Sequence, residues 1–149
     1  KELAPLSREH HDGLLFAWKI KQGLANKTSI ATLCSYTRWF WTNHMKPHFK
    51  DEEKVLVKFL PGDNPLVSQM FNEHAHMRDL IISLDKEPEP NSLQLLAEYI
   101  NNHIRFEERE LFAYAEQTLT PEQLKEVYEE LPENSHCDTE WKDEFWLKK

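Results

Sequence analysis

The sequence predicts an all-α protein, an antiparallel up-and-down four-helix bundle with a short C-terminal helix and tail. Apolar residues recur three or four positions apart through most of the chain, which is the spacing of one helix face. Glycine is scarce, with three residues in 149, and stretches that alternate apolar and polar residues as strands do are hard to find. Two proline-containing breaks, at 61–65 and 87–90, leave long segments joined by short connections, which is typical of antiparallel bundles.

The first predicted helix covers about residues 7–24, with Ser7 as its N-cap. The second begins at position 28 or 29 and ends near position 60. Pro47 lies inside this second helix and should kink it, because proline removes one backbone donor and crowds the preceding turn.

The third predicted helix lies between the two breaks, and the fourth covers about residues 92–117. Thr120 and Gln123 form a capping-box pattern around a proline at the first helical position. This pattern predicts a short fifth helix that ends near position 131. The polar tail that follows contains three aromatic residues that could pack back on the bundle, namely Trp141, Phe145 and Trp146.

A chain of 149 residues with 40% apolar residues is long enough to bury a substantial core. We therefore expect a single domain over residues 1–149, with the bundle at about 6–118 and the short helix and tail at 119–149. The net charge of −8 makes nucleic acid and anionic membranes poor partners. No apolar run approaches the roughly 20 residues that cross a bilayer.

The cysteines and the N-terminal residues bear on where the protein works. Cys34 and Cys137 lie too far apart in the chain for a local metal-ligand pair, and two cysteines do not make a disulfide framework. The first residues lack the apolar core of a secretory signal. We therefore expect reduced thiols and a cytoplasmic location.

Eight histidines occur in this acidic chain, and their directions can be compared with the apolar face of each helix, because a helix turns about 100° per residue. His48 and Glu52 are four positions apart and share a face with apolar residues of the second helix. His103 and Glu107 repeat this spacing in the fourth helix. Burial of an unpaired carboxylate is costly, so two such pairs facing the core require positive charge between them.

The first and third helices each add one inward histidine. His74 lies within the apolar stripe of the third helix, whereas His76 points away from that stripe. His10 lies near the centre of the apolar face of the first helix, and His11 is the alternative. His44 lies four positions before the first residue of the second-helix pair. It could be a fifth imidazole ligand, a hydrogen-bond donor in a pocket or a surface residue.

A lone core histidine is more often a hydrogen-bonded structural residue than a ligand, so the metal hypothesis depends on the whole set. Two divalent ions could share two bridging carboxylates, with about two imidazoles on each ion. Neutral imidazole and carboxylate suit iron and leave positions open for a small ligand. The predicted ligands are His10, His48, Glu52, His74, His103 and Glu107, with His11 and His44 as alternative or pocket residues.

Four segments carry a resemblance to a known family, namely Arg8-Glu9-His10-His11, His48-Phe49-Lys50-Asp51-Glu52-Glu53, Glu73-His74 and His103-Ile104-Arg105-Phe106-Glu107-Glu108-Arg109. Together they resemble a hemerythrin-like domain over about residues 6–118. The resemblance implies an up-and-down four-helix bundle with an oxo- or hydroxo-bridged di-iron site. It implies the same ligands, with the first-helix ligand either His10 or His11.

The chain departs from the oxygen carriers of this family at two positions. Those proteins have a second third-helix histidine four residues after the first, and here that position is Arg78. Their fourth-helix carboxylate is an aspartate one residue further along than Glu107. The sequence is therefore more similar to the bacterial hemerythrin-like branch. Its site has an additional open position or recruits His44.

We therefore expect a cytoplasmic di-iron protein that binds or senses a small ligand, such as oxygen, peroxide or nitric oxide, or that handles iron. One alternative is a di-iron redox enzyme of the peroxidase or nitric oxide reductase type. Another is a zinc-binding or metal-free helical interaction module. A metal-binding protein is favoured over a dedicated enzyme, and the oligomeric state is left open. The candidates for the apolar wall of the site include Trp18, Phe71, Met77 and Phe106.

Overall fold

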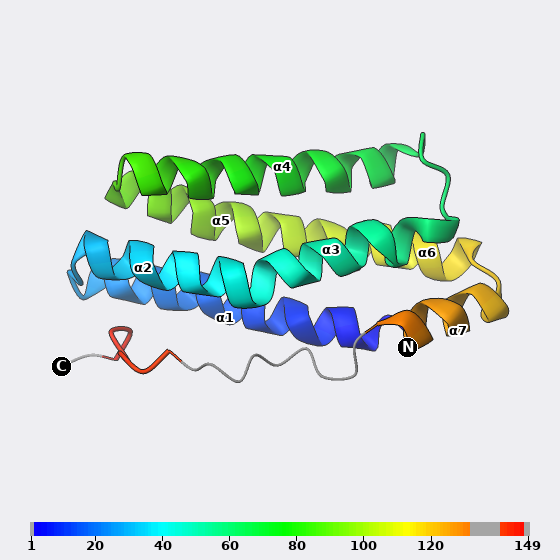
Figure 1. Ribbon diagram of the computed structural model, residues 1–149, viewed down its shortest axis with the longest axis horizontal. Coiled ribbons are helices and arrows are strands. Elements are labelled where there is room, and N and C mark those ends of the chain that lie inside the picture. Colours follow the sequence, from blue (N-terminus) through cyan, green and yellow to red (C-terminus); the bar gives the residue numbers. More distant parts are fainter. Residues whose placement is uncertain (1, 132–140, 148–149) are drawn as a thin grey trace.

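The computed structural model describes residues 2–131 and 141–147, and all regular structure in this part of the chain is helical. Figure 1 shows the helices packed side by side as a bundle. The long helical stretches are α1 (Ala4–Ala25), α2 (Ile30–Phe40) with η1 (Trp41–Met45) and α3 (Lys46–Lys54), α4 (Pro65–Lys86), and α5 (Pro90–Phe106) with η3 (Glu107–Leu111) and α6 (Phe112–Thr118). The shorter elements are η2 (Leu56–Phe59) and α7 (Pro121–Glu130).

Two helices begin earlier than the sequence predicts, and in both cases a proline lies in the first turn. α1 has its N-cap at Leu3 and contains Pro5 in its first turn, while α5 begins at Pro90. Proline suits the first turn because its fixed φ is helical and its missing N–H would have no intrahelical partner there. The predicted N-cap role of Ser7 is wrong, and its hydroxyl instead donates to Glu108 at 3.1 Å.

The starts of α2, α4 and α7 carry side-chain caps, of which the sequence predicts the one at α7. The Ser29 hydroxyl accepts the backbone N–H of Thr32 at the start of α2. The Asn64 side chain accepts the N–H of Leu66 at the start of α4. The capping box that opens α7 is present in both directions. These caps satisfy backbone donors that the first helical turn leaves without partners.

A π-helical turn precedes Pro47, at the place where the sequence predicts a kink. The turn η1 ends just before Pro47, and the N–H of Lys46 donates to the carbonyl of Trp41, five residues earlier. The wider turn absorbs the backbone disturbance that a proline causes, since proline has no N–H to donate. A second π-helical turn, η3, begins at Glu107. Both π turns therefore lie beside predicted ligands, which is where such turns are frequently found.

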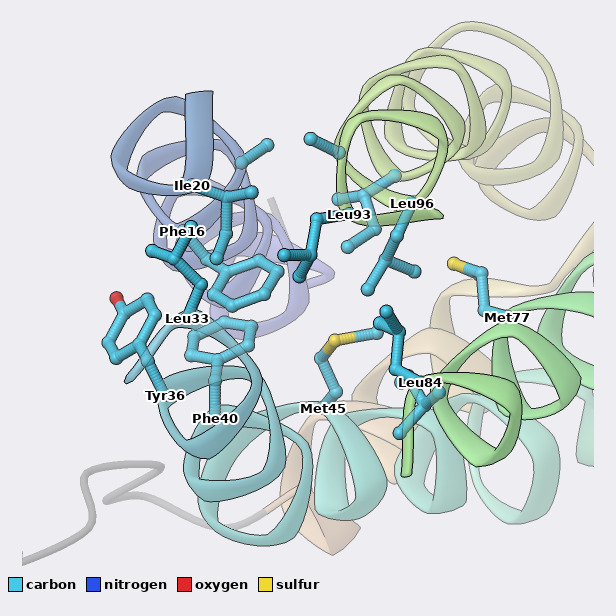
Figure 2. Close-up of a cluster of buried hydrophobic side chains, with 14 of the residues drawn as sticks. Phe16, Ile20, Leu33, Tyr36, Phe40, Met45, Met77, Leu84, Leu93 and Leu96 are labelled. Carbon is cyan, nitrogen blue, oxygen red and sulfur yellow. The ribbon is translucent and has the colours of Figure 1, made fainter. Parts of the chain in front are cut away.

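The buried apolar residues form two clusters separated along the bundle by the histidines. In α1, Leu6 belongs to one cluster and Phe16 to the other, with His10 between them. In α4, Met70 and Met77 belong to different clusters on either side of the predicted ligand of that helix. Figure 2 shows the cluster that contains Phe16. The polar site therefore lies between two apolar layers that hold its walls in place.

Two large apolar residues of α1 and α4 face solvent. Leu14 is 42% exposed and Phe71 is 41% exposed. In α1 the inward face is rotated toward Gly13, where a Cβ would lie 3.0 Å from the Ile104 side chain. Because glycine permits this close approach of α1 to α5, the neighbouring Leu14 is turned outward.

The C-terminal segment 141–147 packs on the bundle beside α1 (Figure 1). The Phe145 side chain is buried, and a Cβ on Gly23 would lie 2.8 Å from its ring. The side-chain amide of Asn26 donates to the carbonyl of Phe145 at 3.1 Å. Cys34 is a buried free thiol, whereas Cys137 lies outside the described residues. None of the described helices is long and apolar enough to span a membrane.

Candidate metal centre

The structure brings the six predicted ligands together in the interior of the bundle. Each of these side chains is buried, and both glutamates are fully so, with 0% exposure. The alternative first-helix residue, His11, is exposed, which favours His10. His76 is also exposed, as its position on the helix predicts.

These six residues form two groups that share both glutamates. One group combines Glu52 and Glu107 with the histidines of α1 and α3, and the other combines them with the histidines of α4 and α5. Within each group, one candidate ligand atom of every residue lies within 4.8 Å of the others. Two imidazoles and two carboxylates around one point suit a borderline divalent cation.

The imidazole Nε2 atoms all point at the two carboxylates. His48 Nε2 lies 3.0 Å from Glu52, and His103 Nε2 lies 3.0 Å from Glu107. His74 Nε2 lies 3.0 Å from Glu52 and 3.3 Å from Glu107. His10 Nε2 lies 2.7 Å from Glu107. Each glutamate therefore faces imidazoles of both groups, as a bridging carboxylate must.

Several of these atoms lack a hydrogen-bond partner although they are buried. They are Nε2 of His48, Nε2 of His103 and both carboxylate oxygens of Glu52. The short His48–Glu52 separation does not change this, because the two groups do not meet with hydrogen-bond geometry. Unpaired buried donors and acceptors are rare and costly. Inward lone pairs on these nitrogens and oxygens would be satisfied by cations, so the residues present fit a metal site.

The Nδ1 side of each histidine is held by a second carboxylate from a neighbouring helix. The four pairs, each at 2.6 or 2.7 Å, are His10 with Glu108, His48 with Glu9, His74 with Glu53, and His103 with Glu73. We call these four partners the outer glutamates. A carboxylate that accepts the Nδ1–H fixes the tautomer and orients the Nε2 lone pair toward the metal.

Prediction from sequence did not identify the outer glutamates, although a signal was present. Each one is adjacent in the chain to an inner residue of the site, as Glu9 is to His10 and Glu53 is to Glu52. The partner of each outer glutamate, however, lies on another helix, so no spacing within one helix reveals the pairing. A step of one residue rotates the side chain by about 100° toward the neighbouring helix.

Arg78, at the position of the missing imidazole, lies outside the inner group. Its guanidinium donates to Glu53 at 3.1 Å and lies 5.7 Å from the centre of the Phe49 ring. Phe49 in turn stacks on His74 with ring centres 3.8 Å apart. Arg78 therefore offsets the charge of one outer glutamate, and the other three have no arginine partner among the contacts of the described residues.

Without a cation, protons balance the carboxylates. Burial opposes protonation of His48, but the glutamates around it, led by Glu52, raise its pKa to about 9. Burial also opposes protonation of His74, and hydrogen bonds led by the one to Glu107 raise its pKa to about 11. The pKa of Glu52 lies well below its usual value, because nearby imidazolium groups, led by His48, outweigh the effect of burial. The site thus attracts positive charge strongly.

Aromatic side chains close the site. Phe49 covers His74, and Phe112 stacks on His10 with ring centres 5.1 Å apart. Phe106 and Met77 are buried, as expected of the wall. Trp18 and Phe71 were also expected there, but they are 48% and 41% exposed. Their predicted wall role is wrong, because both lie on the solvent side of their helices.

A small cavity adjoins the imidazoles. It has a volume of about 30 Å³ and is lined by His10, His48 and His103 together with residues such as His44 and Met45. This volume matches one water molecule or one diatomic molecule. The His44 ring stacks on Phe40, and His44 belongs to neither ligand group of the described residues. Among the sequence alternatives, the structure therefore places His44 in the pocket wall.

A buried set of imidazoles and shared carboxylates in a helical bundle defines a metal-cation-binding domain. The sequence model of the family described as "Hemerythrin HHE cation binding domain" matches residues 6–115. The chain therefore belongs to the hemerythrin family of cation-binding domains, as the motif resemblance predicts. No curated protein and no solved structure matches the chain.

Proposed function

We propose that this protein holds two iron ions, linked by an oxo or hydroxo bridge, and uses them to bind or sense a small ligand. Glu52 and Glu107 would bridge the ions. His10 and His48 would complete one ion, and the histidines of α4 and α5 the other. The single observation that carries the proposal is that two separate ligand groups share both buried carboxylates.

The donor set favours iron over the harder and softer metals. Four imidazoles and two carboxylates suit iron, copper or zinc better than magnesium or calcium, which prefer oxygen ligands. A structural zinc ion would be satisfied by four protein ligands, whereas octahedral iron with the same four ligands keeps two positions open. The antiparallel up-and-down four-helix arrangement that we propose for the bundle supplies these ligands from four long helical stretches.

The small cavity beside the imidazoles supports a small ligand such as oxygen, peroxide or nitric oxide. The bound iron would supply the redox chemistry. The chain's own residues would orient the ligand, exclude bulk water and hold protons near the site. Phe49 and Phe112, which cover imidazoles of the two groups, keep the surroundings dry. In such surroundings electrostatic interactions are strong.

Metal analysis of protein produced in iron-rich and in iron-limited medium tests the proposal. We expect about two iron ions per chain in the first preparation and near-ultraviolet absorption of an oxo-bridged ferric pair. The His76→Ala variant is the matched control, because this exposed histidine lies outside both groups. Zinc in both preparations, or a metal content that depends on His76, would contradict the proposal.

A further inference from the structure

A second pocket lies at the surface next to the small cavity. Its volume is about 300 Å³, ten times that of the cavity beside the imidazoles. The pocket is lined by Asp12, Leu15, Phe16, Lys19, Tyr36, Trp39, Phe40, His44, Trp141 and Trp146. Seven of these ten residues have aromatic rings, counting the histidine, so the wall is mainly aromatic. We call this space the aromatic chamber.

The aromatic chamber and the small cavity share three lining residues, Asp12, Phe40 and His44. These three side chains therefore separate the surface pocket from the space beside the predicted ligands. The cavity continues on the inner side to His10 and His48. The two spaces therefore adjoin one another at these three residues.

Two of the three shared residues, Phe40 and His44, belong to a stack of rings. Phe40 stacks on Phe16 with ring centres 4.4 Å apart, and His44 stacks on Phe40 at 5.1 Å. Figure 2 shows Phe40 projecting from α2 toward Phe16. His44 is the outermost member of this stack and also meets Trp39 edge to face at 5.2 Å. Because Phe16 and Phe40 are fixed in the core while His44 is half-buried, His44 is the member best able to move.

The backbone under His44 is irregular. His44 lies in the π-helical turn η1, which accommodates Pro47. Such turns are rare and are frequently found at functional sites. A change of the His44 side-chain rotamer alone would leave the buried ligands of α3 in place.

The C-terminal segment completes the aromatic chamber. Trp141 meets Tyr36 edge to face at 5.2 Å, and the ammonium of Lys19 lies 3.8 Å from the centre of the Trp146 ring. Both tryptophans lie outside the residues that match the family, 6–115. The C-terminal part of the chamber wall therefore lies outside the family match, while the rest of the wall lies inside it.

We propose that the aromatic chamber is the entry site for small uncharged ligands of the metal centre, and that His44 is the gate between the chamber and the cavity. This inference rests on the proposed function. Apolar walls favour neutral molecules because ions lose hydration there. Asp12 at the boundary and the glutamates behind it repel anions. Nitric oxide or oxygen fits both the size of the cavity and the lack of charge.

Stopped-flow binding of nitric oxide to the reduced, iron-loaded protein tests the gate. A gate changes the barrier but neither end state, so association and dissociation rates change together and Kd stays constant. His44→Ala should raise both rates by about 3-fold or more, and His44→Trp should lower both, with Kd within about 2-fold. Trp146→Ala, which widens the chamber, should raise both rates less. His11→Ala is the control and should leave them unchanged.

The proposal that His44 is the gate would be contradicted if both rates were unchanged in both His44 variants. It would also be contradicted if only the dissociation rate changed and Kd changed with it. A wild-type protein that takes up no iron or binds no nitric oxide would refute the proposed function itself. In that case, a separate experiment on metal-free protein tests whether the chamber takes up small uncharged molecules.

That experiment follows indole N–H resonances of the metal-free protein by NMR under xenon pressure, because xenon enters apolar cavities. Trp39, Trp141 and Trp146 should shift with saturation. Trp18, which is exposed and lines neither space, is the internal control and should not shift. Equal shifts of all four tryptophans, or no shift of the first three, would contradict the proposal that small uncharged molecules enter the chamber.

Discussion

Neighbouring glutamates in this protein occupy two different regions of one site. Glu52 is fully buried between the imidazoles, while Glu53, the next residue, has 17% side-chain exposure and holds Nδ1 of His74. Glu107 and Glu108 repeat the contrast, with 0% and 38% exposure. One step along a helix separates a residue that faces the cations from a residue that orients their ligands.

The inner and outer carboxylates are in different physical environments. An inner carboxylate has no water around it and needs a cation or a proton. An outer carboxylate is partly exposed to solvent and already accepts a hydrogen bond from an imidazole. The outer glutamates should therefore tune metal binding, whereas the inner pair should determine whether it occurs.

The largest expected effect comes from Glu52→Ala. Both ions lose a shared ligand and much of their counter-charge, so metal affinity should fall by more than about 100-fold, beyond the range for outer partners. The melting temperature of protein purified from iron-rich medium should fall as well, because metal binding contributes to folding. Glu53→Ala is the matched control from the adjacent position. Equal metal loss in the two variants would break the distinction between inner and outer carboxylates.

Removing the charge of an outer glutamate should have an intermediate effect. Glu73→Gln keeps the shape and a hydrogen-bond acceptor for His103 but removes the charge that makes this imidazole a better donor. Metal affinity should fall by about 10- to 100-fold, measured by competition with a chelator of known affinity. An unchanged affinity would show that this outer carboxylate does not act through its histidine.

The metal-free protein should lose stability as pH rises. Because His48 and His74 have pKa values raised to about 9 and about 11, their contribution to stability is fully present below the unfolded pKa of about 6.5. It is lost as pH rises through 9 and above. The pKa of Glu52 is lowered in the folded protein, so this carboxylate contributes stability at higher pH. That contribution is lost as pH falls below the pKa that Glu52 has in the unfolded chain.

Thermal unfolding of metal-free protein from pH 5 to pH 10 measures this dependence. We expect the highest melting temperature near pH 5–6 and a decline on the alkaline side. Metal-loaded protein should show little decline there, because the ions replace the protons on Nε2. A metal-free protein that becomes more stable between pH 7 and pH 9 would contradict the charge balance assigned to the site.

The smallest expected effect comes from Arg78. Replacing it by glutamine removes the positive charge beside Glu53, so cation affinity should rise, by about 2-fold at low salt, because the guanidinium is partly exposed and screened. Chelator competition at low and high salt measures the change. A decrease in affinity would indicate that Arg78 orients Glu53 more than it offsets its charge.

Much of this arrangement could be predicted from sequence because it depends on local helical spacing. The pair in α3, the pair formed by His103 of α5 with Glu107 of η3, and the apolar stripes around His10 and His74 predict that all six residues face one interior region. Their role as ligands stays a prediction. The choice between His10 and His11 required the packing of α1 against the other helices.

The features that sequence did not reveal depend on contacts between helices. The outer glutamates pair across helix boundaries, and the rotation of α1 that exposes Leu14 follows from the close approach of α5 at Gly13. The π turns at η1 and η3 are changes of backbone hydrogen bonding that apolar periodicity does not record. Periodicity predicts which face is buried, but not the register or the neighbours of that face.

The most direct test of the bridging carboxylates is anomalous diffraction at the iron edge from crystals of iron-loaded protein. We predict two anomalous peaks inside the bundle, with Glu52 and Glu107 each in contact with both ions. A single peak, or two ions of which each contacts only one of these glutamates, would contradict the proposed bridging role of Glu52 and Glu107.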